Sequence, residues 1–130
     1  MSAISVCEMM VGVQLRCVIV DDDEAFIKVA QAVLERDGVI VAGAAGNCAE
    51  AVQRAEALRP DVVLIDIRLG EESGFDVARR LADNGPPAAL IMISAHLADY
   101  AGLIAKSPVA GFVPKAELSA SAIHRILGAA

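Results

Sequence analysis

Apolar residues fall along the chain in short unbroken runs that are separated by longer segments of mixed character. The runs are rich in Val, Ile, Leu and Ala, and the central one, Val62–Asp66, places four apolar residues directly before a carboxylate. Unbroken apolar runs of this length are typical of strands that are buried on both faces of a parallel sheet. Five runs are therefore predicted to be strands, and they span residues 15–20, 39–44, 62–66, 89–93 and 110–113.

Between the runs, apolar residues recur at the three- and four-residue spacing of amphipathic helices. In the first of these segments Gly38 is expected to end the helix. Asn47 and Glu50 have the spacing of a capping box, and Ser73 with Asp76 is expected to cap the third helix. A fourth, weaker helix is predicted near residues 97–104, and a fifth from about residue 117 to residue 127. The stripe of the first helix is expected to contain Phe26, Val29, Ala30, Val33 and Leu34.

Strands that alternate with helices in this way predict an α/β fold, because parallel strands are joined by right-handed crossover connections that usually carry a helix. We expect the flavodoxin-like (βα)5 arrangement, in which a five-stranded parallel sheet has the strand order 2-1-3-4-5 and helices on both faces. Residues 15–130 are predicted to form this domain, and residues 1–14 a poorly defined N-terminal extension.

The composition narrows the class of partner. The formal net charge is −6 and no stretch is rich in Lys or Arg, so we expect no direct nucleic-acid binding by this domain. Cys7, Cys17 and Cys48 are far apart and form no CxxC pair, which predicts free thiols in a reducing cytoplasm. Residues 1–14 lack the features of a secretory signal and are too short and too polar to span a membrane, so no membrane partner is expected.

Polar side chains end the predicted strands at one edge of the sheet. Asp21 and Asp22 follow the first strand and Asp66 ends the third, while Ser94 and Lys115 follow the fourth and fifth. Because the first and third strands are neighbours in the expected order, the three carboxylates converge, and their mutual repulsion requires a cation. Oxygen ligands with room for water suit Mg²⁺, so Asp21, Asp22 and Asp66 are predicted to bind this ion.

A carboxylate beside a divalent ion can attack a phosphoryl group and form an acyl phosphate. The charge on the transferred oxygens must then be neutralised from several sides. The Lys115 ammonium and the Ser94 hydroxyl are placed to do so together with the ion, and Asp66 is the candidate nucleophile. The sequence therefore favours Mg²⁺-dependent phosphoryl chemistry at Asp66.

The same residues carry a resemblance to a known family. Asp21-Asp22, the segment 62–66, Ile93-Ser94-Ala95 and the segment 111–115 resemble the motifs of the receiver domain of two-component response regulators, and they occur in the same order. The resemblance covers about residues 15–127. It implies a cytoplasmic, bacterial phosphoacceptor domain that is regulatory, assists its own phosphorylation and dephosphorylation, and is not otherwise an enzyme.

The resemblance implies a role for several residues at this edge. Asp66 would be phosphorylated by a sensor histidine kinase, and Lys115 would correspond to the lysine that is typical of the family. Asp21 and Asp22 would be the metal-binding acidic pair, and the backbone carbonyl of Arg68 would be a further ligand of Mg²⁺.

The resemblance also implies how phosphorylation is transmitted and reversed. Ser94 would be the switch hydroxyl and Phe112 the switch aromatic residue, so that phosphorylation would reshape the face made by the fourth helix, the fifth strand and the fifth helix. That face would contact a downstream effector protein or a missing output domain, or would form a phosphorylation-dependent dimer. Arg68 and His96, two residues after Asp66 and Ser94, would flank the water that hydrolyses the acyl phosphate.

The sequence departs from the usual pattern of the family in two loops. Gly70 stands four residues after Asp66, where many receivers have proline. Ala116 follows Lys115, where many have proline, and Pro114 precedes it instead. The pattern therefore leaves the path of the loop around Lys115 open.

Other classes of protein use part of this pattern. A flavodoxin needs a phosphate loop rich in Ser, Thr and Gly after the first strand, where Asp21-Asp22-Asp23 would repel a phosphate. A haloacid-dehalogenase-like phosphatase needs a second Asp at the position of Arg68. A non-phosphorylated pseudo-receiver is disfavoured because the set of site residues is complete. The output stays open between a stand-alone regulator and the receiver fragment of a DNA-binding transcriptional regulator.

Overall fold

The structure is a computed structural model that describes residues 14–128 of the chain. Apart from Gln14, the predicted N-terminal extension lies outside the described residues, as does Cys7. Cys17 and Cys48 are buried free thiols, as expected. Burial, and secondly the charge of Glu35, raises the pKa of the Cys17 thiol to about 12, so this residue behaves as a small apolar side chain.

Five parallel strands form the central sheet, and the order β2-β1-β3-β6-β7 corresponds to the expected order 2-1-3-4-5. The predicted strand ends are correct to within one residue, because the apolar runs stop where the chain reaches the sheet edge. The strands are β1 (Arg16–Val20), β2 (Ile40–Ala45), β3 (Val62–Asp66), β6 (Ala89–Ser94) and β7 (Gly111–Pro114).

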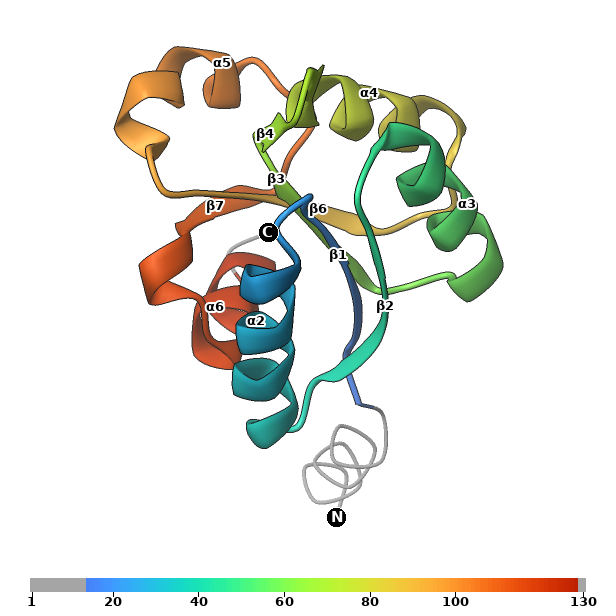
Figure 1. Cartoon of the computed structure of the whole chain (residues 1–130), viewed down its shortest axis with the longest axis vertical. Coiled ribbons are helices and arrows are strands. Elements are labelled where there is room, and N and C mark those ends of the chain that lie inside the picture. Colours follow the sequence, from blue (N-terminus) through green and yellow to red (C-terminus); the bar gives the residue numbers. More distant parts are fainter. Residues whose placement is uncertain (1–13, 129–130) are drawn as a thin grey trace.

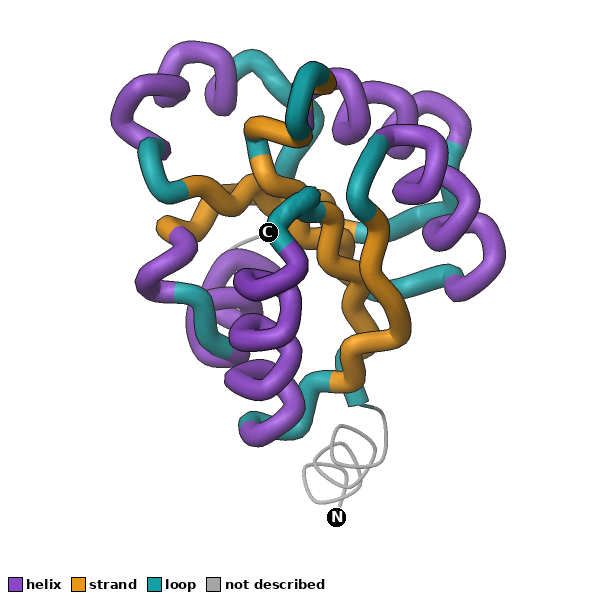
Figure 2. The backbone as a smooth tube through the Cα atoms, viewed as in Figure 1, coloured by secondary structure: helices purple, strands orange, loops and turns teal. Residues whose placement is uncertain are grey.

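Helices cover both faces of the sheet (Figure 1), and the strands lie between the two groups of helices (Figure 2). One face carries α2 (Glu24–Arg36) and α6 (Ala120–Gly128), and the other carries α3 (Cys48–Leu58), α4 (Gly74–Asn84) and α5 (Ala101–Ala105). No helix in the described part of the chain has the length and apolar character needed to cross a bilayer.

Each face of the sheet has its own apolar core, because successive side chains of a strand point to opposite faces. In β3, Val63 and Ile65 pack toward α3, α4 and α5, whereas Val62 and Leu64 pack toward α2 and α6. All five residues of β3 are buried, as the unbroken apolar run predicts. The sheet therefore holds Asp66 at a point that is enclosed from both sides.

Side chains that begin the helices also fix the loops around the site. Asp23 Oδ1 accepts hydrogen bonds from the N–H groups of Ala25 and Phe26 at the start of α2. The expected capping box of α3 is present. Asn47 Oδ1 accepts a hydrogen bond from the Glu50 N–H at 2.9 Å, and Glu50 Oε1 accepts one from the Gly46 N–H, which lies just before the helix. These bonds satisfy N–H groups that have no partner within their own helix.

The apolar stripe expected for α2 includes more residues than the helix buries. Ala30 and Leu34 are buried against the sheet, and Phe26 and Val33 are half-buried, but Val29 is 61% exposed. A helix that packs on one side of a sheet buries only the positions that point at the strands. Val29 lies on the flank of α2, where it lines a groove beside the turn that follows β7.

The apolar spacing of this segment predicts that Phe75, Ala78, Leu81 and Ala82 face inward, and the observed inward face of α4 is rotated relative to that prediction. Val77 is buried and Ala82 is exposed, whereas Ala78 and Leu81 are buried as expected. Ser73 Oγ accepts a hydrogen bond from the Phe75 N–H at 3.1 Å and caps the helix. Asp76 does not complete the expected cap. Its carboxylate pairs instead with Arg79, which lies one turn further along the helix, at 3.4 Å.

The two C-terminal helices are shorter than predicted. The fourth is divided into a 3₁₀ turn, η1 (Leu97–Tyr100), and the five-residue α5. The apolar spacing predicts that Ala101 and Ile104 face inward, but only Ile104 is buried and Ala101 is exposed. The fifth does not begin near residue 117, because η2 (Lys115–Glu117) is a separate 3₁₀ turn with trans peptide bonds. Ser119 Oγ accepts from the Ala122 N–H at 3.0 Å, so α6 starts only after this residue.

The sequence pattern did not predict a small antiparallel hairpin directly after Asp66. It consists of β4 (Arg68–Leu69) and β5 (Glu72–Ser73), joined by the turn Gly70-Glu71. Gly70 has φ of +60°, in the left-handed region that glycine adopts without strain and proline cannot adopt. Glycine at this position therefore gives the loop a path that the family's more usual proline would not permit.

Candidate functional site

The site lies at the carboxyl edge of the sheet, where β1, β3 and β7 end. Asp21 and Asp22 follow β1, Asp66 is the last residue of β3, and Lys115 is the first residue after β7. One carboxylate oxygen from each of Asp21, Asp22 and Asp66 lies within 4.8 Å of the others. The predicted convergence of the three carboxylates is thus present in the structure, because β1 and β3 are hydrogen-bonded neighbours.

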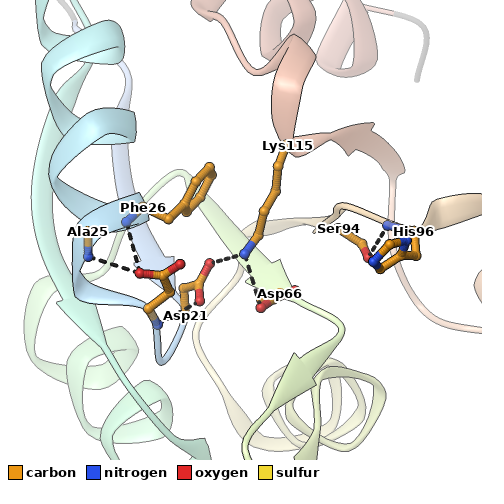
Figure 3. A network of polar contacts seen from close by, with 8 residues as sticks. Asp21, Ala25, Phe26, Asp66, Ser94, His96 and Lys115 are labelled. Atoms are coloured by element: carbon orange, nitrogen blue, oxygen red, sulfur yellow. Dashed lines mark hydrogen bonds and ion pairs between the residues drawn. The ribbon is translucent and has the colours of Figure 1, made fainter.

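Lys115 reaches from the opposite side of the site to a point between two of these carboxylates (Figure 3). Its Nζ lies 2.7 Å from Asp21 Oδ2 and donates a hydrogen bond to Asp66 Oδ2 at 3.3 Å. The same ammonium lies 4.4 Å from the centre of the Phe26 ring, which is the distance of a cation–π contact. The positive charge is therefore fixed beside Asp66 by three partners.

Asp21 is fully buried, and its two oxygens have different environments. Oδ1 accepts a hydrogen bond from the Asp23 N–H at 2.9 Å. Oδ2 has the close ion pair with Lys115 but accepts no hydrogen bond of good angle from a described residue. A buried carboxylate oxygen with this unused capacity, beside two further carboxylates, fits a hard divalent cation such as Mg²⁺.

The electrostatics of Asp66 are dominated by burial. Burial raises the pKa of this carboxyl and the charge of Asp21 raises it further, while Lys115 and the backbone N–H of Arg68 act in the opposite direction. The result is a pKa of about 6 instead of the usual value near 3.8. Asp66 is therefore mainly ionised at neutral pH, and the low solvation that raises its pKa also favours its reaction as a nucleophile.

Lys115 keeps its charge in this environment. Burial acts to lower the pKa of the ammonium, but the close contact with Asp21 and the charges of Asp66 and Asp21 together outweigh burial, so the pKa is raised. The site thus contains a permanent cation beside the candidate nucleophile.

Ser94 ends β6, the strand next to β3, and its side chain is buried. Its Oγ accepts a hydrogen bond from the His96 N–H at 3.0 Å, so the hydroxyl oxygen is engaged with its own loop. No hydrogen bond joins Ser94 to Asp66 among the described residues. Ser94 is one residue beyond Ile93, which is the strand position paired with Asp66.

The remaining predicted residues lie at the rim of the site. Arg68 and His96 are both exposed, and neither side chain has a hydrogen bond or ion pair with another described residue. Phe112 is 52% exposed and points out of β7, so it is not a fixed core residue. The structure therefore brings Asp21, Asp22, Asp66 and Lys115 into one cluster and leaves the four other predicted side chains outside its direct contacts.

One contact of the site was not anticipated from the sequence. Phe26 is a member of the apolar stripe of α2, and its position gives no indication that the ring faces Lys115. The signal that could have revealed the contact is distance along the chain, because Phe26 lies in the first turn of the helix that follows Asp21 and therefore stays at the same sheet edge.

The comparisons with known proteins agree with this geometry. The model of the response regulator receiver domain matches residues 17–127. The chemotaxis protein CheY of Thermotoga maritima is 35% identical over 79 residues, which cover 60% of this chain and 66% of that protein. The DNA-binding transcriptional activator DevR/DosR of Mycobacterium tuberculosis is 33% identical over 99 residues, which cover 75% of this chain and 46% of that protein.

Among solved structures, the signal receiver domain of the response regulator NarL from Mycobacterium tuberculosis superposes with a TM-score of 0.74 at 28% identity. The alignment covers 89% of this chain and 95% of that domain. The chain spans only 66% and 46% of the length of the two curated relatives. The chain belongs to the response regulator receiver domain family, whose members are the regulatory phosphoacceptors of two-component signalling.

Proposed function

We propose that this domain accepts a phosphoryl group on Asp66 from a sensor histidine kinase in the cytoplasm and thereby switches a protein-interaction surface. The observation that carries the proposal is the position of Asp66 beside the Lys115 ammonium, which lies between Asp66 and the buried Asp21 carboxylate and donates to Asp66 at 3.3 Å. A solvated strand-end carboxylate would have neither neighbour. The arrangement combines a nucleophile with a fixed positive charge.

Asp21, Asp22 and Asp66, with the backbone carbonyl of Arg68, would hold Mg²⁺. When bound, this ion supplies positive charge to the phosphoryl oxygens. Asp66 attacks the phosphorus, so that an oxygen–phosphorus bond forms as the bond between phosphorus and the kinase histidine breaks. Lys115, which is already paired with Asp66, then faces the new phosphoryl oxygens and neutralises part of their charge.

One approach of the phosphoryl donor to Asp66 would pass beside Lys115. A groove of 350 Å³ adjoins Lys115 and is lined on the α2 side by Phe26, Val29 and Val33. Val29 is exposed and forms a contiguous apolar lining with Phe26, Val33 and Leu118, which is the character of a contact surface. This groove is therefore our candidate for the surface that the kinase contacts during transfer.

Transmission of the signal would use Ser94 and Phe112. Phosphoryl oxygens on Asp66 offer charged acceptors to the Ser94 hydroxyl, and the resulting hydrogen bond would draw Ser94 away from its present bond with His96. Phe112 starts from an exposed position and would turn into the space behind Ser94. The surface of α5, β7 and α6 would then change by a shift in population, and present a new face to an effector, an output domain or a second copy.

Reversal of the signal would depend on the rim. Arg68 and His96 lie two residues beyond Asp66 and Ser94, and both are exposed. A long cation at Arg68 would cover the acyl phosphate and slow the approach of water. Arg68→Ala should therefore change the rate of dephosphorylation and leave labelling intact, whereas an unchanged half-life would mean that Arg68 only points to solvent.

A second function is favoured by one relative. DevR/DosR is a DNA-binding transcriptional activator, and this chain aligns with less than half of it. The chain would then be the receiver part of such a regulator, and DNA would be bound by another part of the protein, since the net charge here is −6. The native reading frame at this locus distinguishes this arrangement from a stand-alone regulator.

The direct test is labelling with acetyl phosphate and Mg²⁺, followed by mass spectrometry of the intact protein and of its peptides. The proposal requires one phosphoryl group on the peptide that contains Asp66, and no labelling of Asp66→Asn or of Asp22→Ala. Full labelling of Asp66→Asn would assign the acceptor to another residue. Rapid turnover of acetyl phosphate without a stable adduct would favour a phosphatase.

A further inference from the structure

The hairpin of β4 and β5 is too small to hold its own position. Each strand has two residues, and an isolated two-stranded hairpin is at best marginally stable in water. Yet this hairpin begins two residues after Asp66 and contains Arg68, whose carbonyl is a proposed ligand of the cation. The geometry of the cation site therefore depends on what fixes the hairpin to the rest of the fold.

Two contacts fix the first strand and the base of the hairpin. Leu69 is buried in the core beneath α3 and α4. At the base, the Gly74 N–H donates to the Ile67 carbonyl at 2.7 Å, and a Cβ at Gly74 would overlap the Asp66 carbonyl. These contacts hold the start and the base of the hairpin but leave β5 and the turn without support from a second element.

Glu72 supplies that support from the start of α3. Its Oε1 accepts a hydrogen bond from the Cys48 N–H at 2.8 Å. Cys48 is the first residue of α3, so its N–H has no partner within the helix. The local cap does not use this N–H, because Asn47 accepts from Glu50 and Glu50 accepts from Gly46. A carboxylate is also favoured there by the helix dipole.

The turn of the hairpin lies against the cation site. A Cβ placed on Gly70 would lie 3.6 Å from Asp22 Oδ2, so the backbone of the turn and the Asp22 carboxylate are neighbours. Asp22 is the exposed member of the three carboxylates and has no hydrogen bond to hold its side chain among the described residues. The position of the turn therefore limits the space open to Asp22, and the position of β4 sets that of the Arg68 carbonyl.

We infer that Glu72 is a positioning residue for the divalent cation, which acts by tying the hairpin to the first N–H of α3. This inference rests on the proposed function, because it presupposes that the carboxylate cluster binds Mg²⁺. With the bond to Cys48 in place, the hairpin is ordered before the ion arrives. Without it, ion binding must also order the hairpin, and affinity falls by the free energy of that step.

Variants of Glu72 distinguish the effect of its hydrogen bond to Cys48 from the effect of its negative charge alone. Glu72→Gln removes the charge but keeps an oxygen that can accept from Cys48, whereas Glu72→Asp keeps the charge but is one methylene too short. Glu71→Gln is the matched control, because Glu71 is exposed in the same turn and has no side-chain hydrogen bond or ion pair to a described residue. None of these changes removes a ligand of the cluster.

Each ¹⁵N-labelled protein is titrated with MgCl₂, and binding is monitored through the amide chemical shifts of Asp22, Gly70 and Cys48. We expect Glu72→Gln to bind Mg²⁺ like Glu71→Gln, and Glu72→Asp to bind more weakly than the natural chain by about tenfold or more, as the loss of one hydrogen bond to a charged group implies. The Cys48 amide should be displaced in Glu72→Asp before any Mg²⁺ is added.

The other possible outcomes of this titration would each contradict the inference or the proposed function. If Glu72→Asp binds like the natural chain, or Glu72→Gln binds more weakly than Glu72→Asp, charge and not position is the cause and the inference is wrong. A lower unfolding temperature of Glu72→Asp with unchanged Mg²⁺ affinity would make Glu72 a structural cap only. If the natural chain itself shows no Mg²⁺-dependent shifts at Asp22, the proposed function fails before the role of Glu72 is tested.

Discussion

At the edge that holds Asp66, every residue of β3 is buried, Asp21 has no exposed surface, and Lys115 is bound by three partners. The segment from η1 to β7 is held far more loosely. Neither η1 nor α5 has a side-chain hydrogen bond at its N-cap, and only Ile104 of α5 is buried. Leu103 and Phe112 are 54% and 52% exposed. The chemical site is thus rigidly built, whereas the region proposed to respond to it has little local stability to lose.

The largest expected effect comes from placing the same methyl group in each of these two regions. Gly74→Ala at the start of α4 forces a Cβ against the Asp66 carbonyl, and should destabilise the fold by about 3 kcal/mol. Gly102→Ala in α5 meets no atom within 4 Å and should stabilise the protein by about 0.5 to 1 kcal/mol. Urea unfolding of both variants measures the contrast, and similar effects at the two sites would contradict it.

A second effect concerns the charge of Asp66 in the metal-free protein. Its pKa is raised to about 6, so the stability associated with its protonated form is present below about pH 4 and is lost as the pH rises through 6. Asp66→Asn removes this penalty, which is at most about 3 kcal/mol and already includes the favourable pairing with Lys115. We expect a net gain of about 1 to 2 kcal/mol at pH 7 in EDTA.

Urea midpoints of the natural chain and of Asp66→Asn at pH 4 and pH 7 test this expectation. The advantage of Asp66→Asn should be present at pH 7, be small at pH 4, and be reduced at pH 7 when Mg²⁺ is added. Asp83→Asn, on an exposed carboxylate of α4 that has no side-chain hydrogen bond or ion pair to a described residue, is a control for the change of side chain. An Asp66→Asn protein that is less stable at pH 7 would show that the pairing with Lys115 outweighs burial.

A third effect tests the boundary between the two regions. Ser94→Ala leaves the His96 N–H without its acceptor and should cost about 1 kcal/mol. Labelling at Asp66 should persist, but beryllofluoride should no longer shift the amides of Phe112 and residues 97–104. Ser94→Thr keeps the hydroxyl and should restore those shifts. If they persist in Ser94→Ala, the signal reaches this segment by another route.

The smallest expected effect is at Phe112. Truncation of a buried phenylalanine usually costs about 3 to 5 kcal/mol, but a half-exposed ring loses much less. Phe112→Ala should therefore lower the free energy of unfolding by about 1 kcal/mol or less, and should abolish the response of α5 to beryllofluoride. A loss of several kcal/mol would mean that the ring is a core residue after all.

The apolar runs were sufficient to predict the sheet, because a strand that is buried on both faces has no polar position and therefore produces a run of apolar residues in the sequence. Val62–Asp66 is an example in which the strand and the carboxylate at its end follow from five consecutive residues. The convergence of Asp21 and Asp66 followed from the strand order alone. These features depend on topology, which the alternation of strands and helices determines.

Features that depend on side-chain packing between distant elements could not be predicted in this way. Val29 belongs to a regular apolar stripe, and only the absence of a neighbouring element leaves it exposed. The bond from Glu72 to Cys48 joins residues in two elements whose spacing along the chain has no pattern. The hairpin around Gly70 is too short to produce a periodic signal, and its turn became visible only through the φ of one glycine.

The ion pair between Asp21 and Lys115 has a consequence for the order in which the site forms during synthesis and folding. It joins the first strand of the sheet to the last, at 2.7 Å. A chain that grows on the ribosome exposes Asp21 early and must complete four more strands before Lys115 can reach it. Until then the carboxylate has no cationic partner from the fold, and Asp66 lacks its fixed positive neighbour. The complete set of charges around Asp66 therefore forms only late in synthesis. A shortened chain that ends before β7 should fold incompletely and should not be phosphorylated by its phosphoryl donor.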